Sequence, residues 1–324
     1  MQACRSQRLR GALAVVMLLA LFGQGAWAEG ARTIKIVVPF PPGGTVDVLA
    51  RLLGEQISKT RGPTVLVENR PGAGASIAYD AVARAAPDGN TLVIVGNSVV
   101  INPNLRKVSY DPATSFEPVC YLVKSPQVIV VNSASPYRTL NDLVAAARAK
   151  PGELSFATVG PATTQHIGFE QFKRLLKLDL TYVPYPGGAP AINALLGGHV
   201  TAVLANYSEA VEQLNGGTLR ALAATSPQRI EPLPDVPTVT ELGSGSYQVE
   251  VWLGLVAPAK TPKETVAELA TWFTAATQAT DVNPKLIKLG LYPVGICGAD
   301  FAAHIRQQFE EYARIIREAN IKGE

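Results

Sequence analysis

The chain has 324 residues, with 29 Lys and Arg against 26 Asp and Glu, so its formal net charge is +3. Arg5, Arg8 and Arg10 account for that excess, and the chain that follows them is balanced in charge. A neutral chain without basic runs argues against nucleic acid or anionic lipid as a partner. This length is large for a single hydrophobic core and favours two lobes.

The first 28 residues have the pattern of an export signal. Three arginines precede an apolar run at 11–22, and Ala-Trp-Ala at 26–28 matches a small-residue cleavage site. A membrane anchor is the alternative, but the run is short for a bilayer span. Cys4 precedes the run, which argues against lipid attachment at a processed cysteine. We therefore expect cleavage, a mature chain from about Glu29 in the periplasm, and no later membrane span.

Strand-like and helix-like segments alternate along the rest of the chain. Short runs rich in Val and Ile predict strands at 34–39, 64–68, 91–95, 128–131, 154–158, 180–184, 200–204, 219–224 and 251–257. Helical periodicity predicts helices at 47–59, 77–85, 140–150, 166–176, 189–196, 208–214, 263–279 and 299–319. This alternation predicts an α/β fold with mainly parallel sheets flanked by helices.

The domain organisation expected from this pattern is discontinuous. After the signal at 1–28, one lobe comprises residues 29–125 plus 255–324, and the other comprises residues 126–254. The chain would then cross between the lobes twice, which makes a hinge, and a cleft between lobes is where a small ligand binds. A split into two sequential domains is the competing interpretation.

The first strand leads into a loop that is suited to an anion. After the apolar run from Ile34, the loop contains Phe40, Pro41, Pro42, Gly43 and Gly44. A helix begins at once, so its free N–H groups and positive dipole end point at one place. The alternative is a purely structural role, in which the loop is a rigid connection that ends the strand. Asp47 is expected to cap the first helical turn rather than to contact an anion.

Comparable loops occur in the middle of the chain. Thr158, Thr163 and Thr164 follow a strand and precede a helix, where they either cap it or bind a ligand. Gly187, Gly188 and Ala189 repeat the strand, Gly-Gly, helix arrangement, and Asn206 does so more weakly. In open parallel sheets, ligands gather beyond the carboxyl ends of strands. These loops lack Lys and Arg at 39–44, 158–164 and 185–189, so neutral dipoles would have to hold an anion.

Patterns of catalytic residues are missing from the sequence. There is no GxSxG, HExxH or paired CxxC, and the three histidines, His166, His199 and His304, lie on different predicted elements. We therefore expect no enzyme activity, no cofactor and no metal site. Cys120 and Cys297 either form a disulfide or are two separate buried thiols, and both alternatives remain open.

The chain resembles the Bug family, the periplasmic solute-binding proteins of tripartite tricarboxylate transporters. The resemblance is carried by IVVPFPPGGTVD at 36–47, VENRPGAG at 67–74, PDGNTL at 87–92, YPGGAPA at 185–191 and LRALA at 219–223. It spans essentially the whole mature chain and implies a two-lobed periplasmic-binding-protein (Venus flytrap) fold. It also implies a carboxylate held between the lobes by backbone amides and bridging waters.

The resemblance also assigns binding positions. They are Phe40, Pro41, Pro42, Gly43 and Gly44 in the first lobe, and Thr158, Gly160, Thr163 or Thr164, Gly187, Gly188 and Ala189 in the second. Asn206 departs from the aspartate-containing loop of many relatives, which suggests a ligand without an amino group. The identity of the ligand does not transfer within the family.

These observations predict a monomeric, non-enzymatic receptor for a small organic carboxylate, with a dicarboxylate favoured. Closure of the lobes would deliver the ligand to integral-membrane transporter subunits. One alternative is a receptor that presents its closed form to a sensor kinase. The other is an exported enzyme that acts on a carboxylic acid through a lone residue such as His166.

Overall fold

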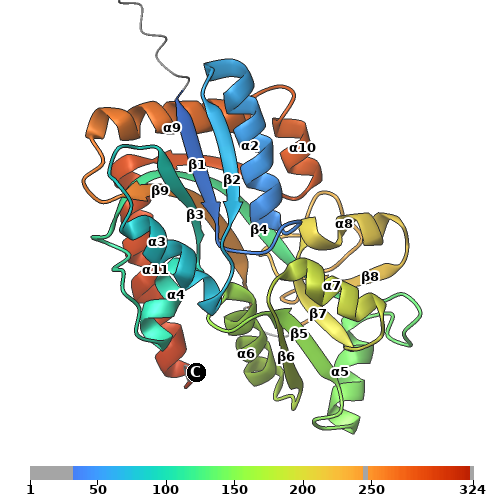
Figure 1. The fold of residues 1–324 in the computed structure, drawn as a ribbon. Helices are drawn as coiled ribbons and strands as arrows, with labels where there is room; N and C mark the ends of the chain where they lie inside the picture. The colour runs from blue at the N-terminus through green and yellow to red at the C-terminus, as the bar shows by residue number, and fades with distance from the viewer. Residues whose placement is uncertain (1–31, 244–246, 322–324) are drawn as a thin grey trace, which may run out of the picture. The chain divides into compact units, whose positions relative to one another are not determined.

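The computed structural model describes residues 32–243 and 247–321, and the residues from Thr33 onward form one compact unit (Figure 1). The predicted export signal lies outside the described residues. The strands are β1 (Thr33–Val38), β2 (Thr64–Asn69), β3 (Thr91–Gly96), β4 (Phe116–Asn132), β5 (Ser155–Val159), β6 (Thr181–Tyr185), β7 (Ala202–Asn206), β8 (Leu219–Ala224), β9 (Glu250–Pro258) and β10 (Tyr292–Cys297).

The helices alternate with these strands along most of the chain. They are α2 (Thr45–Arg61), the 3₁₀ turn η1 (Ala73–Ala75), α3 (Ser76–Ala83), α4 (Ser98–Leu105), α5 (Leu140–Ala149), α6 (Thr164–Leu176), α7 (Gly188–Leu196), α8 (Tyr207–Asn215), α9 (Lys263–Gln278), α10 (Asn283–Lys288) and α11 (Gly298–Glu318). None of the helices that the structure describes combines the length and the apolar character needed to cross a bilayer.

The strands form two groups that share one strand. In the first group β1 pairs in parallel with β2 and β3, and β9 joins β3 to β4 in antiparallel pairing. In the second group β5 pairs in parallel with β6 and β7, while β7 and β8 pair antiparallel to β4. The parallel pairs are those joined by helical crossovers, as the alternating sequence predicts.

Strand β4 belongs to both groups because it is long and changes partners along its length. From Phe116 to Pro126 it pairs with β9, and from Gln127 to Asn132 it pairs with β7 and β8. Strand β10 pairs antiparallel to the first part of β4. The change of partners at Pro126 and Gln127 divides the strands into the two groups.

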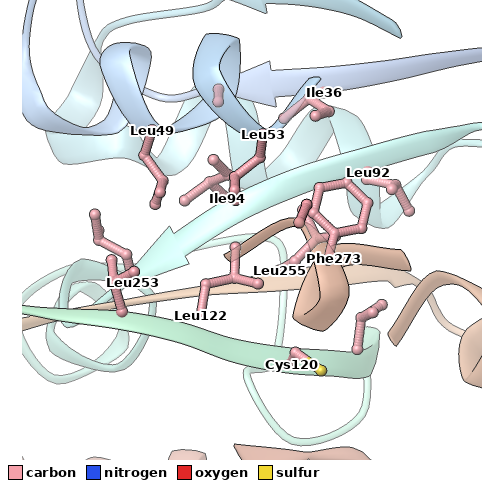
Figure 2. Close-up of a cluster of buried hydrophobic side chains, with 14 of the residues drawn as sticks. Ile36, Leu49, Leu53, Leu92, Ile94, Cys120, Leu122, Leu253, Leu255 and Phe273 are labelled. Atoms are coloured by element: carbon pink, nitrogen blue, oxygen red, sulfur yellow. The ribbon is translucent and has the colours of Figure 1, made fainter. Parts of the chain in front are cut away.

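Each group of strands is covered by helices on both faces. Because side chains alternate along a strand, Ile36 packs toward α2 and α9, while its neighbour Val37 packs toward α3, α4 and α11. The first of these clusters includes Leu49, Leu53 and Phe273 (Figure 2). In the second group, α5 and α6 cover one face, and α7 and α8 cover the other.

Helix α2 shows how the sequence sets one of these layers. Its buried apolar residues recur with helical spacing and form the stripe that meets the sheet. They are Val46, Leu49, Ala50, Leu53 and Ile57. The helix ends at Gly62, which has a φ of 89°, a left-handed conformation that glycine adopts without steric cost.

Cys120 and Cys297, which the sequence left open, form a disulfide. The two cysteines are paired residues of β4 and β10, and 177 positions separate them along the chain. Cys120 is fully buried in the cluster of Figure 2. The bond ties the C-terminal strand and helix to the first group of strands.

Candidate ligand-binding site

A cavity lies where the ends of several strands meet the beginnings of helices. The junctions β1–α2, β3–α4, β5–α6, β6–α7 and β7–α8 all contribute to it, together with β9. The lining residues are Phe40, Pro41, Pro42, Gly44, Thr45, Val46, Gly96, Asn97, Ser98, Val159, Thr163, Thr164, Gln165, Gly187, Gly188, Ala189, Pro190, Asn206, Glu209, Val251 and Leu253. The cavity thus lies beyond the carboxyl ends of the strands, where α/β proteins bind small molecules.

Most of the residues predicted from the sequence are brought together in this lining. They are Phe40, Pro41, Pro42, Gly44, Thr163, Thr164, Gly187, Gly188, Ala189 and Asn206. The first of these segments lies more than 100 positions before the others, so the convergence of the loops is a property of the fold. Three predicted residues, Gly43, Thr158 and Gly160, are placed outside the lining.

Local hydrogen bonds explain the positions of these three residues. The Gly43 amide, at a φ of 83°, donates to Asp47 Oδ2 over 3.0 Å. The buried Thr158 hydroxyl donates to the carbonyl of Val159 over 2.8 Å. The Gly160 amide donates to the Tyr185 carbonyl over 2.7 Å, and this glycine lines a neighbouring cavity instead. Their polar groups are used by the protein itself.

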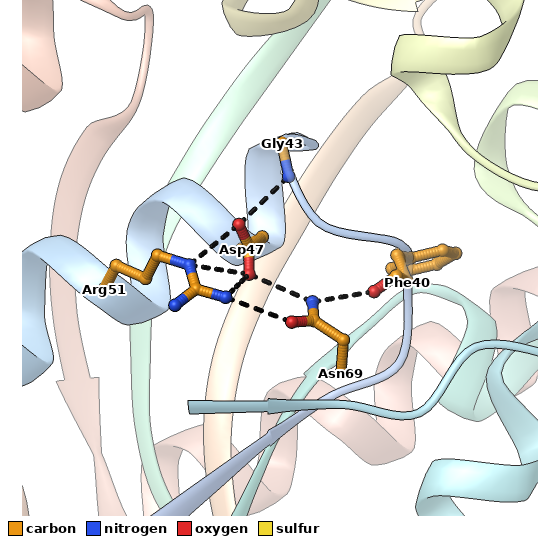
Figure 3. A network of polar contacts seen from close by, with 5 residues as sticks. All are labelled: Phe40, Gly43, Asp47, Arg51 and Asn69. Atoms are coloured by element: carbon orange, nitrogen blue, oxygen red, sulfur yellow. Dashed lines mark hydrogen bonds and ion pairs between the residues drawn. The ribbon is translucent and has the colours of Figure 1, made fainter. Parts of the chain in front are cut away.

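The first loop is held in shape by Asp47 and Asn69 (Figure 3). Asp47 accepts hydrogen bonds from Gly43, from Asn69 Nδ2 over 2.9 Å and from Arg51. The same Asn69 nitrogen donates to the Phe40 carbonyl over 3.0 Å. Asp47 therefore stabilises the turn into α2, as the sequence predicts, and it does not line the cavity.

The electrostatics of Asp47 fit this structural role. Its burial alone would raise the pKa of the carboxyl group, but hydrogen bonds from Arg51, Gly43 and Asn69 outweigh burial and lower it. The carboxylate is therefore charged at neutral pH and balanced by Arg51. Because Arg51 balances it, Asp47 adds no net charge beside the cavity.

Thr163, which precedes α6, acts as its N-cap. The Thr163 hydroxyl accepts from the His166 amide over 3.3 Å and donates to the Val159 carbonyl over 2.9 Å. His166 is buried, its Nδ1 accepts from the Ala162 amide over 3.4 Å, and its ring stacks on Tyr182. The histidine thus packs behind the loop and is not among the lining residues.

Hydrogen bonds cross the cavity between the two groups of strands. Asn206, at the end of β7, donates through Nδ2 to the Thr45 hydroxyl over 3.0 Å. The Thr45 and Ser208 hydroxyls lie 2.6 Å apart. Gln165 Nε2 donates to Asn206 Oδ1 over 3.3 Å. Thr45 begins α2, so its bonds with Asn206 and Ser208 join the first helix to the end of β7 and the start of α8, while the Gln165 bond lies within the second group.

Glu209 brings a carboxylate into the cavity, and the sequence analysis did not single it out. Its Oε2 accepts from the Asn206 amide over 3.1 Å, and its Oε1 accepts from Asn206 Nδ2 over 3.2 Å. Burial raises the pKa of Glu209, and hydrogen bonds from Asn206 and Thr45 offset part of the increase. Among the described residues that line the cavity, Glu209 is the one with an acidic side chain, and none is lysine or arginine.

Two glycines let the backbone approach this carboxylate. A Cβ atom built on Gly188, the first residue of α7, would overlap the Glu209 carboxyl group. A Cβ on Gly44 would lie 3.8 Å from Glu209 Oε1. The carboxylate therefore rests against the N-terminal end of α7 and close to that of α2. These are the helix ends that the sequence analysis assigned to an anion.

A signal for Glu209 and for the β3–α4 residues was present in the sequence. Asn206 and Glu209 form a capping box, and the spacing Asn-x-x-Glu at a helix start is its signature. Asn97 and Ser98 follow a predicted strand, where the carboxyl-end rule would place them at the site. They were missed because α4 was not predicted as a helix.

No group of three or more His, Cys, Asp or Glu side chains within 32–243 and 247–321 is arranged to hold a metal ion. Apart from the Glu209 carboxyl group, the polar groups in the lining are amide N–H groups, hydroxyls and side-chain amides. This set suits a hydrogen-bond acceptor such as a carboxylate.

A family model described as "Tripartite tricarboxylate transporter family receptor" matches residues 49–321. The chain belongs to this family. Its fold is that of the two-lobed periplasmic binding proteins, which confirms the α/β class and the resemblance to Bug proteins found in the sequence. The structure of the periplasmic binding protein BugD has a TM-score of 0.87 to this receptor and 32% identity, over 90% of this chain and 99% of BugD.

Two similar solved structures contain a ligand. Rpa4515 of R. palustris, solved with adipate, has a TM-score of 0.87 and 32% identity, over 92% of this chain and 100% of that one. MatC (Rpa3494) of Rhodopseudomonas palustris, solved with bound malate, has a TM-score of 0.82 and 32% identity, over 89% of this chain and 99% of that one. Both ligands are small dicarboxylates.

Proposed function

We propose that this chain is a periplasmic receptor that captures a small organic carboxylate, in the first place a dicarboxylate, and delivers it to the membrane subunits of a tripartite tricarboxylate transporter. The observation that carries the proposal is the cavity at the strand-to-helix junctions, with the ends of α2 and α7 facing it. The adipate and malate bound by similar receptors support the choice of ligand class.

The anion would be held by dipoles instead of cations. Gly44 and Thr45 lie at the beginning of α2, and Gly188 and Ala189 at the beginning of α7, so the first-turn amides of two helices lie at one cavity. Hydrogen bonds from amides to a charged acceptor are strong where water is excluded. The predicted binding residues outside the lining, Gly43, Thr158 and Gly160, would act by shaping the loops.

The two lobes would move about the segments that connect them. We propose limits of 29–125 plus 255–324 for one lobe and 126–254 for the other, because β4 changes partners between Pro126 and Gln127. Strand β9 pairs with the first group from Glu250 onward, so the pairing favours a return crossing near Glu250, a few residues before the limit predicted at 254/255. A ligand drives closure only by binding the closed arrangement more tightly than the open one.

The remaining parts of the proposal follow from the same site. A receptor of this kind works without catalysis, cofactor or metal, and the signal at 1–28 would direct its export to the periplasm and then be cleaved. We further propose that it acts as a monomer, since the cavity is built from one chain. N-terminal sequencing of the exported protein should begin at about Glu29.

A thermal-shift screen followed by calorimetry tests the binding function. The panel consists of adipate, malate, aromatic acids and amino acids, with adipamide as the uncharged control of the same shape as adipate. The proposal expects a dicarboxylate to raise the melting temperature and adipamide to leave it unchanged. A folded protein that responds to no member of the panel would contradict it. Loss of uptake of that dicarboxylate on deletion of the gene tests delivery.

A further inference from the structure

The carboxylate of Glu209 lies where the ligand is expected to place one of its own. It rests on Gly188 at the beginning of α7 and near Gly44 at the beginning of α2. It accepts from the Asn206 amide over 3.1 Å and from Asn206 Nδ2 over 3.2 Å. The helix ends that would attract an anion are therefore already next to one.

This arrangement creates a charge problem for a dicarboxylate. The described lining contains no lysine or arginine, so whenever Glu209 is ionised a doubly charged ligand would meet a second negative charge with no cation to balance it. Like charges within a few ångströms repel strongly where water is excluded. A proton on one of the carboxyl groups removes that repulsion.

We propose that Glu209 is a specificity-determining residue of the carboxylate site and that it admits a dicarboxylate only together with one proton. The inference rests on the proposed function. The proton comes from solvent and resides on Glu209, whose neutral carboxyl group then donates a hydrogen bond to the ligand. A singly charged carboxylate of the same shape binds without this requirement.

The other titratable groups on the surrounding elements do not line the cavity. On α2, Asp47 and Arg51 pair with each other beside Gly43. On α6, His166 lies behind the loop against Tyr182, and on α8, Glu212 is exposed. Glu209 is the titratable group among the described residues that line the cavity. A change in affinity with pH is therefore assigned to it.

The alternative is that Glu209 has a purely structural role as part of a helix cap, because Asn206 and Glu209 form a capping box. The chain offers a matched control in α5, where Thr139 and Asp142 form the same motif outside the cavity. Glu209→Gln keeps the size and the acceptor oxygen of the side chain but removes its charge. Asp142→Asn makes the same change in a cap that faces no ligand.

The sign of the pH effect follows from linkage. Burial already raises the pKa of Glu209 above its usual value, and a bound dianion raises it further. At a pH between the pKa of Glu209 in the free protein and its pKa in the complex, binding takes up a proton. In that range the affinity for the dianion falls by up to about tenfold for each unit that the pH rises. Below the lower value Glu209 is already neutral, so affinity levels off.

The test is titration calorimetry with adipate at pH 5 to 8, with the measurements between pH 7 and pH 8 made both in phosphate and in Tris, which differ in ionisation enthalpy and so report proton uptake. Wild type and Glu209→Gln are compared, so ionisation of adipate itself cancels. We expect wild type to take up close to one more proton per adipate than the variant. We also expect the variant to bind adipate about tenfold more tightly at pH 8.

A second ligand separates charge from shape. Adipic acid monoamide has the shape of adipate but carries one charge less. The ratio of monoamide affinity to adipate affinity should be about tenfold larger in wild type than in Glu209→Gln. Asp142→Asn should bind both ligands as wild type does. Equal proton uptake and equal affinity in wild type and Glu209→Gln would overturn this inference alone, and so would the same affinity change in Asp142→Asn.

Absence of binding by both proteins, with every ligand of the panel, would overturn the proposed function and this inference with it. If Glu209→Gln does not fold, the difference in binding enthalpy between the two buffers in wild type gives the number of protons taken up and so tests the inference. Net proton uptake beyond that of adipate ionisation supports the inference, and none beyond it overturns the inference.

Discussion

The side-chain amide of Asn206 donates to the hydroxyl of Thr45 over 3.0 Å, although 161 positions separate the two residues. Thr45 is the first residue of α2, and Asn206 is the last residue of β7. The Ser208 hydroxyl lies 2.6 Å from the same Thr45 oxygen. These bonds join the two groups of strands directly across the ligand cavity, so they exist only while the two sides of the cavity are together.

Replacing Thr45 by valine should therefore weaken ligand binding more than folding. The change keeps the shape of the side chain and removes the hydroxyl that Asn206 and Ser208 contact. A hydrogen bond of this kind contributes about 1 kcal/mol, so adipate affinity should fall about fivefold. Calorimetry measures the affinity and a thermal melt measures the stability. Thr271→Val, which removes an exposed hydroxyl bonded within α9, is the control. An unchanged affinity in Thr45→Val would show that the crossing bonds do not favour closure.

Gly188→Ala should abolish binding, whereas Gly44→Ala should be tolerated much better. The new Cβ at position 188 would overlap the Glu209 carboxyl group, while a Cβ at position 44 has no heavy atom nearer than 3.8 Å. We expect at least about a tenfold loss of adipate affinity for Gly188→Ala and a change in stability within about 2 kcal/mol. Equal affinities of the two variants would contradict the close approach of backbone and ligand at α7. Bulkier residues, such as valine at position 44, should block binding at either glycine.

The loops of this site were predictable because their sequences carry their own geometry. The prolines at 41 and 42 end the strand, and the two glycines after them leave the backbone accessible before the helix. Both effects are local and do not depend on the rest of the chain. The rule that ligands gather at the carboxyl ends of strands then brings distant loops to one place. The position of Glu209 in the cavity could not be predicted in this way. A capping box is visible in the sequence, but whether its glutamate faces solvent or a cavity depends on α2 and α7.

The elements that were not predicted depend on tertiary packing. Residues 116–127 of β4 include Pro118 and Pro126, which argue against a strand, yet β9 pairs along this stretch with register shifts. Helix α4 contains the β-branched run Val99–Ile101 and Pro103, all poor helix formers. Its apolar side chains pack in the cluster that includes α11, and burial outweighs propensity. Only the assembled fold supplies those partners.

Asp47→Asn should destabilise the protein by about 2 kcal/mol at neutral pH, because Gly43, Asn69 and Arg51 all bond to a carboxylate that is 4% exposed. The folded-state pKa of Asp47 is lowered, so its contribution is fully present above the ordinary value of 3.8. It is lost as the pH falls through the lower folded-state value. Urea unfolding at pH 7, 5 and 3 should show the gap between wild type and variant closing only at the lowest pH. Glu241→Gln, in an exposed pair with Arg229, should change stability far less.

The disulfide between Cys120 and Cys297 should stabilise the fold without affecting the ligand site. It closes a loop of 177 positions, and cross-links of long loops restrict the unfolded chain most, by about 2–4 kcal/mol in typical proteins. Replacing both cysteines by alanine, or reducing the wild type, should lower the unfolding free energy by about that amount. Neither β10 nor α11 contributes a lining residue to the cavity within the described chain, so adipate affinity should stay within about twofold. The alanine variant should also stop responding to reductant. A melting temperature of the wild type that is the same with and without reductant, when mass spectrometry shows complete reduction, would contradict the prediction.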